Sequence, residues 1–314
     1  MGTVRGIEGA TATIELIDGR EITVERNDEF ATTQNQAPIV GDKFVVGRFE
    51  FGEGKIWQIY DHYRLAALLG IFAIFILVLI LIGGWRGLSA LAGLAVSIGG
   101  TIFGIVPALA AGYPPLAVAL VGGAGIAGAA IFIAHGFNFR SLLAFIATML
   151  TLGLATLSAV FFTNFASLFG TGSEESFYLT SALFGNLDLR GLLLAGILLG
   201  ALGVLDDITV AEVTTADELI RANPNLSRKE IFKRTLRIGR EHIASMVNTL
   251  ALAYAGVALP LILLFSVDAN QPLWALINSE FAAEEIVRTL VGSLALVLAA
   301  PLASGLGAFF LKRK

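Results

Sequence analysis

The chain has 314 residues, of which 56% are hydrophobic and 15% are charged, and its formal net charge is −4. Soluble domains carry about 25% charged residues, so this composition excludes a soluble enzyme core and predicts an integral membrane protein. The absence of cysteine excludes disulfides, thiolate zinc sites, iron–sulfur clusters and cysteine nucleophiles.

Residues 1–62 have the pattern of a small β domain. Apolar and polar residues alternate over Thr11–Ile17, as in a half-buried strand, and Asp18 with Gly19 then forms a turn signal before a returning strand at Glu21–Glu25. Four or five short strands in about 60 residues favour a small barrel or sandwich. Its simplest role is structural or in docking a partner.

Seven later stretches are long and apolar enough to cross a bilayer, which takes about 20 residues. We therefore predict an α-helical polytopic membrane protein with a small N-terminal all-β, barrel-like domain at 1–62 and a transmembrane domain at 63–314. Segment 177–187 is too polar to span and is expected to be interfacial or re-entrant. The predicted spans are 64–84, 87–110, 114–134, 141–166, 190–211, 243–266 and 287–310.

The distribution of lysine and arginine predicts the orientation. Segment 217–242 is a basic amphipathic stretch, and the chain ends in Lys312–Lys314, so both should be cytoplasmic. Segment 267–286 is acidic without a basic residue and should lie outside, together with the β domain. The expected location is the cell membrane. Because an external domain of this size usually needs an upstream signal, we expect an earlier membrane helix in the natural protein.

The sharpest chemical feature is a pair of adjacent carboxylates, Asp206 and Asp207, followed by Thr209, at the inner end of an apolar helix. A carboxylate is costly within a bilayer, and two adjacent ones in a low dielectric do not both ionise easily. This arrangement suits proton exchange. The alternative is that both reach headgroup water or cap a packed polar network.

Glycines at helical spacing line the same helix and lead to Asp207, with Glu212 adding polarity beyond it. Such stripes allow close helix–helix contact. The predicted helix-packing residues are Gly196, Gly200 and Gly203 here, and Gly93, Gly100 and Gly104 in the second span.

The span at 243–266 is the expected partner of the aspartate helix. Asn248 lies about one turn inside the membrane, so we predict that it hydrogen-bonds to one of the aspartates. The predicted transport and proton-coupling residues are Asp206, Asp207, Thr209, Glu212, Asn248, Thr249 and Tyr254.

Several motifs that suggest enzymes do not fit their context. The GxGxxG match at Gly123–Gly128 lies in mid-helix, the glycines at 52 and 54 lack the spacing of a phosphate-binding loop, and the three histidines are scattered. We therefore predict no enzyme activity, no cofactor, no metal and no nucleic-acid partner. The expected partners are the lipid bilayer and a small solute or ion, moved passively or by an ion gradient.

The chain resembles the YibE/F family of bacterial multi-pass membrane proteins, in the branch common in Gram-positive bacteria. The resemblance is strongest at Leu199–Thr209, Asn223–Phe232, Arg237–Ile243 and Val247–Leu261. It implies a helical membrane domain, a recurrent intramembrane aspartate at Asp207 and a membrane helix before the β domain, but no settled activity. A weaker local similarity links the Asp-Asp-Ile-Thr helix, the basic segment and Asn-Thr-Leu to proton-coupled export subunits related to RND transporters.

Three functions follow as hypotheses. The leading one is a secondary transporter, an exporter of an unidentified substrate, driven by protons through the aspartate pair. The alternative is a non-transporting scaffold or accessory subunit that binds a partner through its β domain. A lipid-modifying enzyme is weakest, because no nucleophile–base set is visible. A water-filled cavity that reaches Asp207 would favour transport.

Overall fold

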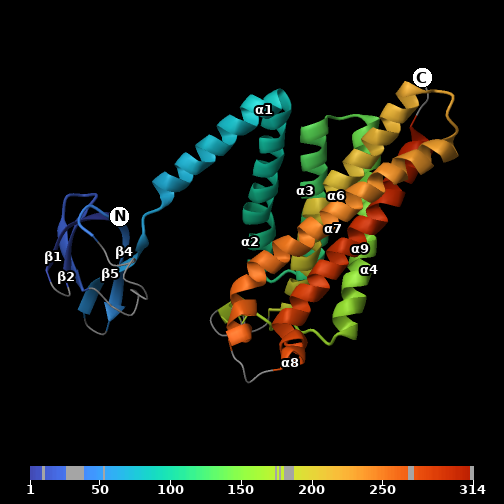
Figure 1. The fold of residues 1–314 in the computed structure, drawn as a ribbon. Helices are drawn as coiled ribbons and strands as arrows, with labels where there is room; N and C mark the ends of the chain where they lie inside the picture. Colours follow the sequence, from blue (N-terminus) through green and yellow to red (C-terminus); the bar gives the residue numbers. More distant parts are fainter. Residues whose placement is uncertain are drawn as a thin grey trace. The chain divides into compact units, whose positions relative to one another are not determined.

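The computed structural model describes residues 1–8, 11–25, 39–51, 54–173, 175–176, 178–179, 187–267 and 272–311. They form two compact units, Met1–Ile82 and Gly83–Lys314, which Figure 1 colours from blue to red. Three features of the sequence analysis lie wholly or partly outside the described residues: most of the segment 177–187 that was predicted to be interfacial or re-entrant, two residues of the rejected phosphate-loop match, and the basic tail Lys312–Lys314.

The N-terminal unit opens with a five-stranded antiparallel sheet of order β3-β2-β1-β4-β5. The edge strands β3 and β5 also contact each other, so the sheet curls around its core. The strands are β1 (Gly2–Glu8), β2 (Thr11–Leu16), β3 (Glu21–Glu25), β4 (Lys43–Phe51) and β5 (Gly54–His62).

The alternation predicted for β2 places its apolar side chains in the core of the sheet. Ala12 and Ile14 are fully buried against Val4. The turn after β2 requires Gly19, whose φ of 80° is costly for other residues. In the same turn the side chain of Arg20 donates a hydrogen bond that lowers the pKa of Asp18. The sheet therefore has a single small apolar core.

In the described part of the chain, seven helical segments are long and apolar enough to cross a membrane, as predicted. In helix α1 (Leu65–Gly100) Gly84 has φ 54° and ψ −136°, which separates two apolar segments, Leu65–Trp85 and Gly87–Ala110. A short π-helix (Thr101–Ile105) and α2 (Val106–Ala110) complete the second segment. The remaining helices are α3 (Pro115–His135), α4 (Phe139–Phe165), α6 (Leu189–Ala222), α7 (Arg228–Val267), α8 (Leu273–Asn278) and α9 (Glu280–Phe310).

The predicted amphipathic segment 217–242 is not a separate element. Its first part continues α6 to Ala222, and from Arg228 it runs without a break into the 40-residue helix α7. A short turn at 223–227 joins the two helices. Pro224 cannot continue α6, and Ser227 Oγ caps α7 by accepting a hydrogen bond from the Glu230 N–H at 3.1 Å. The basic residues therefore extend a predicted membrane helix.

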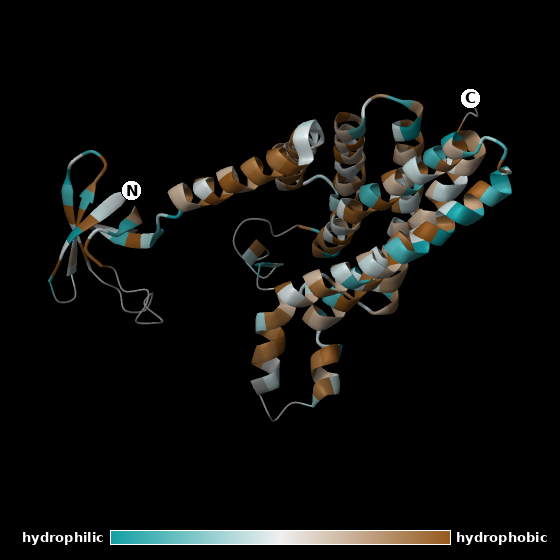
Figure 2. Ribbon diagram, turned by 45° about the horizontal axis from the view of Figure 1, so that its top comes forward, coloured by the Kyte–Doolittle hydropathy of each residue, from teal (hydrophilic) through white to brown (hydrophobic). Residues whose placement is uncertain are grey.

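Helix α6 is the centre of the Gly83–Lys314 unit and packs against α3, α4, α7 and α9 (Figure 1). Ile197, Leu205 and Ile208 are among its fully buried side chains, and alanines of α4 and α9 allow close approach. Large apolar side chains such as Leu157 and Phe161 are exposed on the outside, while Figure 2 shows hydrophilic residues gathered towards helix ends. This distribution suits a lipid environment.

Gly170, in the loop after α4, provides a test of the fold. It has φ 81°, and a Cβ there would lie 2.2 Å from the Leu189 carbonyl oxygen. We expect Gly170→Ala to lower the free energy of unfolding by at least ~2 kcal/mol, through backbone strain and the clash, measured by thermal unfolding in detergent. Gly153→Ala is the control, because Gly153 lies within α4 with no atom near its Cβ position. Equal stability of the two variants would contradict this loop geometry.

Candidate functional site

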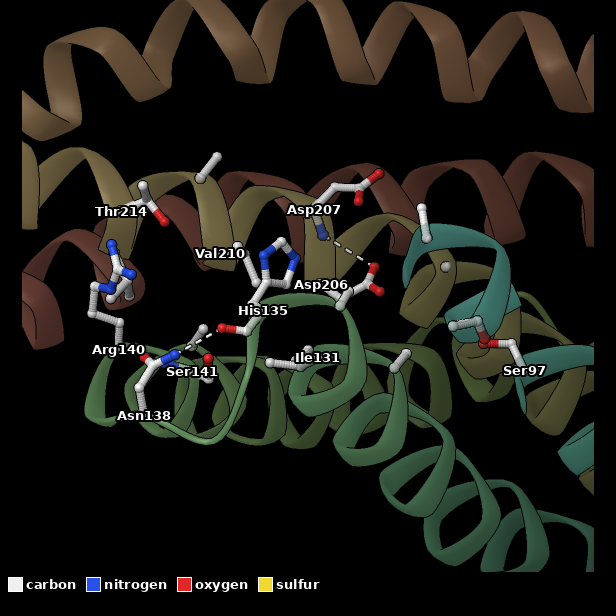
Figure 3. A pocket seen from close by; sticks show the side chains of 18 of the residues that line it. Ser97, Ile131, His135, Asn138, Arg140, Ser141, Asp206, Asp207, Val210 and Thr214 are labelled. Atoms are coloured by element: carbon white, nitrogen blue, oxygen red, sulfur yellow. Dashed lines mark hydrogen bonds between the residues drawn. The ribbon is translucent and has the colours of Figure 1, made fainter. Parts of the chain in front are cut away.

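A pocket of about 950 Å³ lies between the second half of α1, the end of α3, the start of α4 and the middle of α6 (Figure 3). Both predicted aspartates line it. The polar side chains around it are Ser97 from α1, His135 from α3, Asn138, Arg140 and Ser141 from the start of α4, and Asp206, Asp207, Thr214 and Thr215 from α6. A cavity that reaches Asp207, the feature named above as favouring transport over a scaffold, is therefore present.

The two aspartates are adjacent but point in different directions, as Figure 3 shows. The Asp207 N–H donates to Asp206 Oδ1 at 3.0 Å, and Asp206 is half-buried whereas Asp207 is exposed. The His135 imidazole is close enough to Asp207 to interact with its charge. Among the described residues, no lysine or arginine forms an ion pair with either carboxylate. Both carboxylates therefore line the pocket without a lysine or arginine partner among the described residues.

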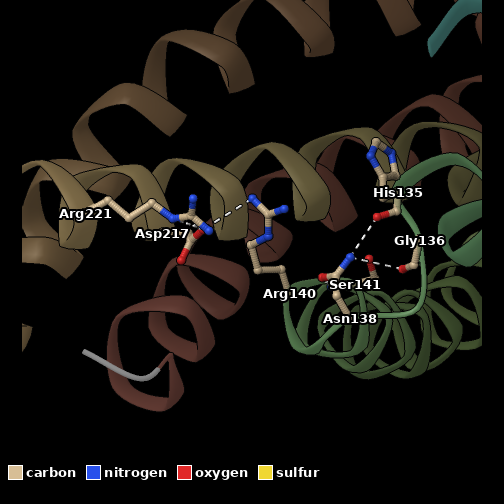
Figure 4. Close-up of polar contacts among 7 residues, drawn as sticks. All are labelled: His135, Gly136, Asn138, Arg140, Ser141, Asp217 and Arg221. Atoms are coloured by element: carbon tan, nitrogen blue, oxygen red, sulfur yellow. Dashed lines mark hydrogen bonds and ion pairs between the residues drawn. The ribbon is translucent and has the colours of Figure 1, made fainter. Parts of the chain in front are cut away.

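One rim of the pocket is held by an ion-pair network that the sequence did not predict. Asp217 Oδ2 lies 3.2 Å from Arg140 Nη1 and 3.0 Å from Arg221 Nε (Figure 4). Asp217 is largely buried, so its two partners offset the cost of its charge. The available signal was the basic segment 217–242, which contains Arg221 and was predicted to be cytoplasmic.

The turn between α3 and α4 is fixed by Asn138. Its Oδ1 accepts from the Ser141 N–H at 3.0 Å and caps α4, while its Nδ2 donates to the carbonyls of His135 and Gly136 at 2.7 and 3.2 Å (Figure 4). These bonds hold His135 at the pocket beside Asp207.

Thr209 and Glu212 do not line the pocket, although the sequence grouped them with the aspartates. Thr209 is fully buried against α4, where its hydroxyl lies 2.8 Å from that of Thr148. Glu212 is fully buried on the side of α9 and accepts a hydrogen bond from Ser304. Successive helical residues are rotated by about 100°, so neighbours in sequence face different helices.

The predicted contact between Asn248 and an aspartate is not formed within the described part of the chain. Asn248 and Thr249 are exposed, and Thr249 Oγ1 donates to its own helix at Ser245 O, 3.0 Å away. Helix α7 instead turns Leu250 and Tyr254 towards the core. The prediction that the polar face of α7 meets α6 was wrong, because the spacing of residues in the sequence does not say which neighbouring helix a face contacts.

Two of the predicted packing glycines of α6, Gly196 and Gly200, lie against polar side chains of neighbouring helices. A Cβ at Gly200 would lie 2.4 Å from the Tyr254 hydroxyl, and one at Gly196 would lie 3.1 Å from Arg288 Nη1. Arg288, which the sequence did not single out, has its Nε 3.3 Å from Glu285 Oε1. Gly203 has no atom within 4 Å of its Cβ position and opens onto the pocket, so only part of the predicted packing role is present.

The stripe of the second span is similarly mixed. A Cβ at Gly100 would lie 2.9 Å from the Ile126 side chain of α3, and one at Gly93 would lie 3.9 Å from Ala130, whereas Gly104 has open space. Helix α1 therefore approaches α3 closely beside the pocket.

At the opposite end of the bundle, acidic residues of α9 hold the loop after α4. Glu280 Oε1 accepts from the Phe169 and Thr171 N–H groups at 2.7 and 3.2 Å, and Glu284 Oε1 accepts from the Gly172 N–H at 3.0 Å. These carboxylates bind the loop after α4. Acidic residues in the predicted outer segment thus have a structural role.

The model of the YibE/F-like protein family matches residues 71–313. The chain belongs to the YibE/F family. No curated protein and no solved structure matches it. The match covers every residue of the pocket and leaves the β sheet of this YibE/F protein outside. The resemblance found in the sequence is confirmed, and the aspartate pocket lies within the family region.

The fit of Tyr254 against Gly200 can be tested in this YibE/F protein by a double-mutant cycle. Gly200→Ala should lower the free energy of unfolding by about 1–3 kcal/mol, because its Cβ would collide with the tyrosine hydroxyl. Tyr254→Phe removes that hydroxyl and should restore most of the loss. Thermal unfolding in detergent would measure the coupling. Gly203→Ala serves as the control, and additive effects of the first two changes would refute the contact.

Proposed function

We propose that this YibE/F protein is a secondary transporter of the bacterial cell membrane, which exports a small solute or ion in exchange for protons bound at Asp206 and Asp207. The pocket of about 950 Å³ that reaches both carboxylates carries the proposal. A tightly filled bundle would favour a scaffold instead. A cavity beside two acids that have no lysine or arginine partner among the described residues gives protons and solutes a common place to bind.

Electrostatics support proton coupling at this pair. A carboxylate is expensive in a bilayer and is retained there mainly at proton or ion pathways. Asp206 and Asp207 share one site, so their negative charges disfavour simultaneous ionisation. Binding of a proton or a cationic solute would relieve the same repulsion. Exchange of the two at one site is the basis of coupling.

The proposed orientation places the pocket end in the cytoplasm. Arg140 and Arg221 lie at this end of α4 and α6, whereas Glu280 and Glu284 bind the loop at the other end of α4. The positive-inside rule assigns the basic end to the cytoplasm. The chain would then cross the membrane seven times, with the β sheet outside and the C-terminus inside.

The second half of α1, which forms one wall of the pocket, is a candidate moving part. Gly93 and Ser97 of α1 face Ala130 and the α6 aspartates across the pocket. Small residues at this contact let one helix slide against another with little change in side-chain packing. Movement of α1 would alter access to the carboxylates.

Proton uptake into proteoliposomes under an imposed membrane potential tests the proposal. We expect the wild-type protein to move protons and Asp207→Asn to reduce the rate to the background of empty vesicles, with Asp206→Asn also impaired, because the amide cannot carry the proton. Glu218→Gln is the matched control, since Glu218 is an exposed acid of the same helix outside the pocket.

Two results would count against transport through the pair. Wild-type protein that moves no protons when folded in vesicles would favour the scaffold hypothesis, and partners of the β sheet would then be sought. Unchanged proton movement in the Asp206→Asn, Asp207→Asn double variant would separate transport from these residues.

A further inference from the structure

Glu212 is a buried acid that the aspartate pocket does not use. Its side chain is fully buried at the junction of α6, α7 and α9. Ser304 Oγ of α9 hydrogen-bonds to Oε2, while Oε1 has no hydrogen-bond partner among the described residues. An acid in this position needs some means of neutralising its charge.

The carboxyl group rests directly on the backbone of α7. A Cβ at Gly239 would lie 2.3 Å from Glu212 Oε1 and 2.6 Å from its Cδ. Only glycine therefore permits this approach, and its Cα hydrogen takes the place facing Oε1. Such a C–H···O contact is weak and does not replace a counter-ion. Thr235, one turn earlier on α7, is also buried with its hydroxyl unpartnered among the described residues.

No charged group compensates Glu212 within the described part of the chain. Asp217 is paired with Arg140 and Arg221, the ionisable side chains of α7 near Gly239 are exposed, and α9 has no ionisable residue between Arg288 and Lys312. Besides Glu212, the ionisable groups of the surrounding helices are Arg190, Asp206, Asp207, Asp217, Glu218 and Arg221 on α6, His135 on α3, Arg140 on α4, Arg228, Lys229, Glu230, Lys233, Arg234, Arg237, Arg240, Glu241, His242 and Tyr254 on α7, and Glu280, Glu284, Glu285 and Arg288 on α9.

We propose that Glu212 is a second proton-binding site, separate from the aspartate pocket, and that its proton holds α7 against α6 and α9. An ionised carboxylate here would be buried without a partner, at a cost of several kcal/mol. The protonated acid instead is uncharged, keeps the hydrogen bond between Oε2 and Ser304 Oγ, and leaves Oε1 against Gly239. Loss of the proton requires water at the carboxylate, so α7 must separate at Gly239.

This separation would be transmitted along α7 because the helix is continuous from Arg228 to Val267. Five basic residues, Arg228, Lys229, Lys233, Arg234 and Arg237, lie before Gly239, and Tyr254, which fits against Gly200, lies beyond it. Protonation of Glu212 would therefore set the position of the basic start of α7 and of Tyr254. The inference rests on packing at this junction and does not depend on transport by the aspartates.

Infrared spectroscopy of the protein in lipid tests the protonation state directly. We expect the difference spectrum between wild type and Glu212→Gln at neutral pH to contain the C=O band of a protonated carboxylic acid. Asp207→Asn, compared in the same way, identifies any contribution from the pocket. Carboxylate bands in place of the acid band for Glu212 would overturn the proposal.

Thiol labelling tests the movement of α7 in a chain that otherwise has no cysteine. Thr235→Cys reports on the junction, and Thr148→Cys, equally buried at the contact of α4 with α6, is the matched control. The ratio of their labelling rates should rise about tenfold or more as alkaline pH removes the Glu212 proton, because exposure of the junction then becomes favourable. The ratio also removes the intrinsic pH dependence of thiol reactivity.

The same assay separates this site from the proposed function. Glu212→Gln should abolish the rise, because the amide has no proton to lose, whereas Asp207→Asn should leave it intact. A constant ratio of labelling rates in the wild-type background, or a rise that persists in Glu212→Gln, would refute the proposal that the Glu212 proton holds α7 in place. Failure of proton transport in vesicles would leave both expectations unchanged.

Discussion

The central constraint on this protein is that α6 carries several acids through the middle of a helix bundle. Because α6 packs against α3, α4, α7 and α9, little of it faces open solvent, and each acidic side chain needs its own means of avoiding an isolated charge. Asp217 has two arginines, Glu212 has Ser304 and, as proposed, a proton, and the adjacent pair Asp206 and Asp207 has a pocket. The contacts of α6 with its neighbouring helices therefore include these ion-pair, hydrogen-bond and pocket environments for its acids.

Small residues make this arrangement possible. Gly239 allows the backbone of α7 to lie on the Glu212 carboxyl, and Gly200 accepts the Tyr254 hydroxyl. In a bilayer, helix association draws little on the hydrophobic effect, so close packing and buried polar contacts have a larger share of the stability. Glycine in these helices is therefore a means of placing polar groups at contacts between helices, in addition to bringing backbones together.

The two ends of the bundle differ in a way that supports a transport hypothesis. At one end, Glu280 and Glu284 hold the loop after α4 by accepting hydrogen bonds from its backbone N–H groups. At the other end the pocket leads to the aspartates beside the Arg140–Asp217 pair. Under the proposed function, alternating access would require the pocket to open towards each end of the bundle in turn. Glu212, on a different side of α6, would add a second proton-dependent contact.

The sequence alone determined the apolar helices, the turn at Asp18 and Gly19, and the family, because length, composition and turn chemistry act locally. Tertiary structure decided that Glu212 faces Ser304, that Asn248 faces outward, and that Arg140 meets Asp217. The reason is physical: in a helix suited to lipid both the inner and the outer faces are apolar, so periodicity does not distinguish them. Spacing places residues on a common face, but only packing decides which helix that face meets.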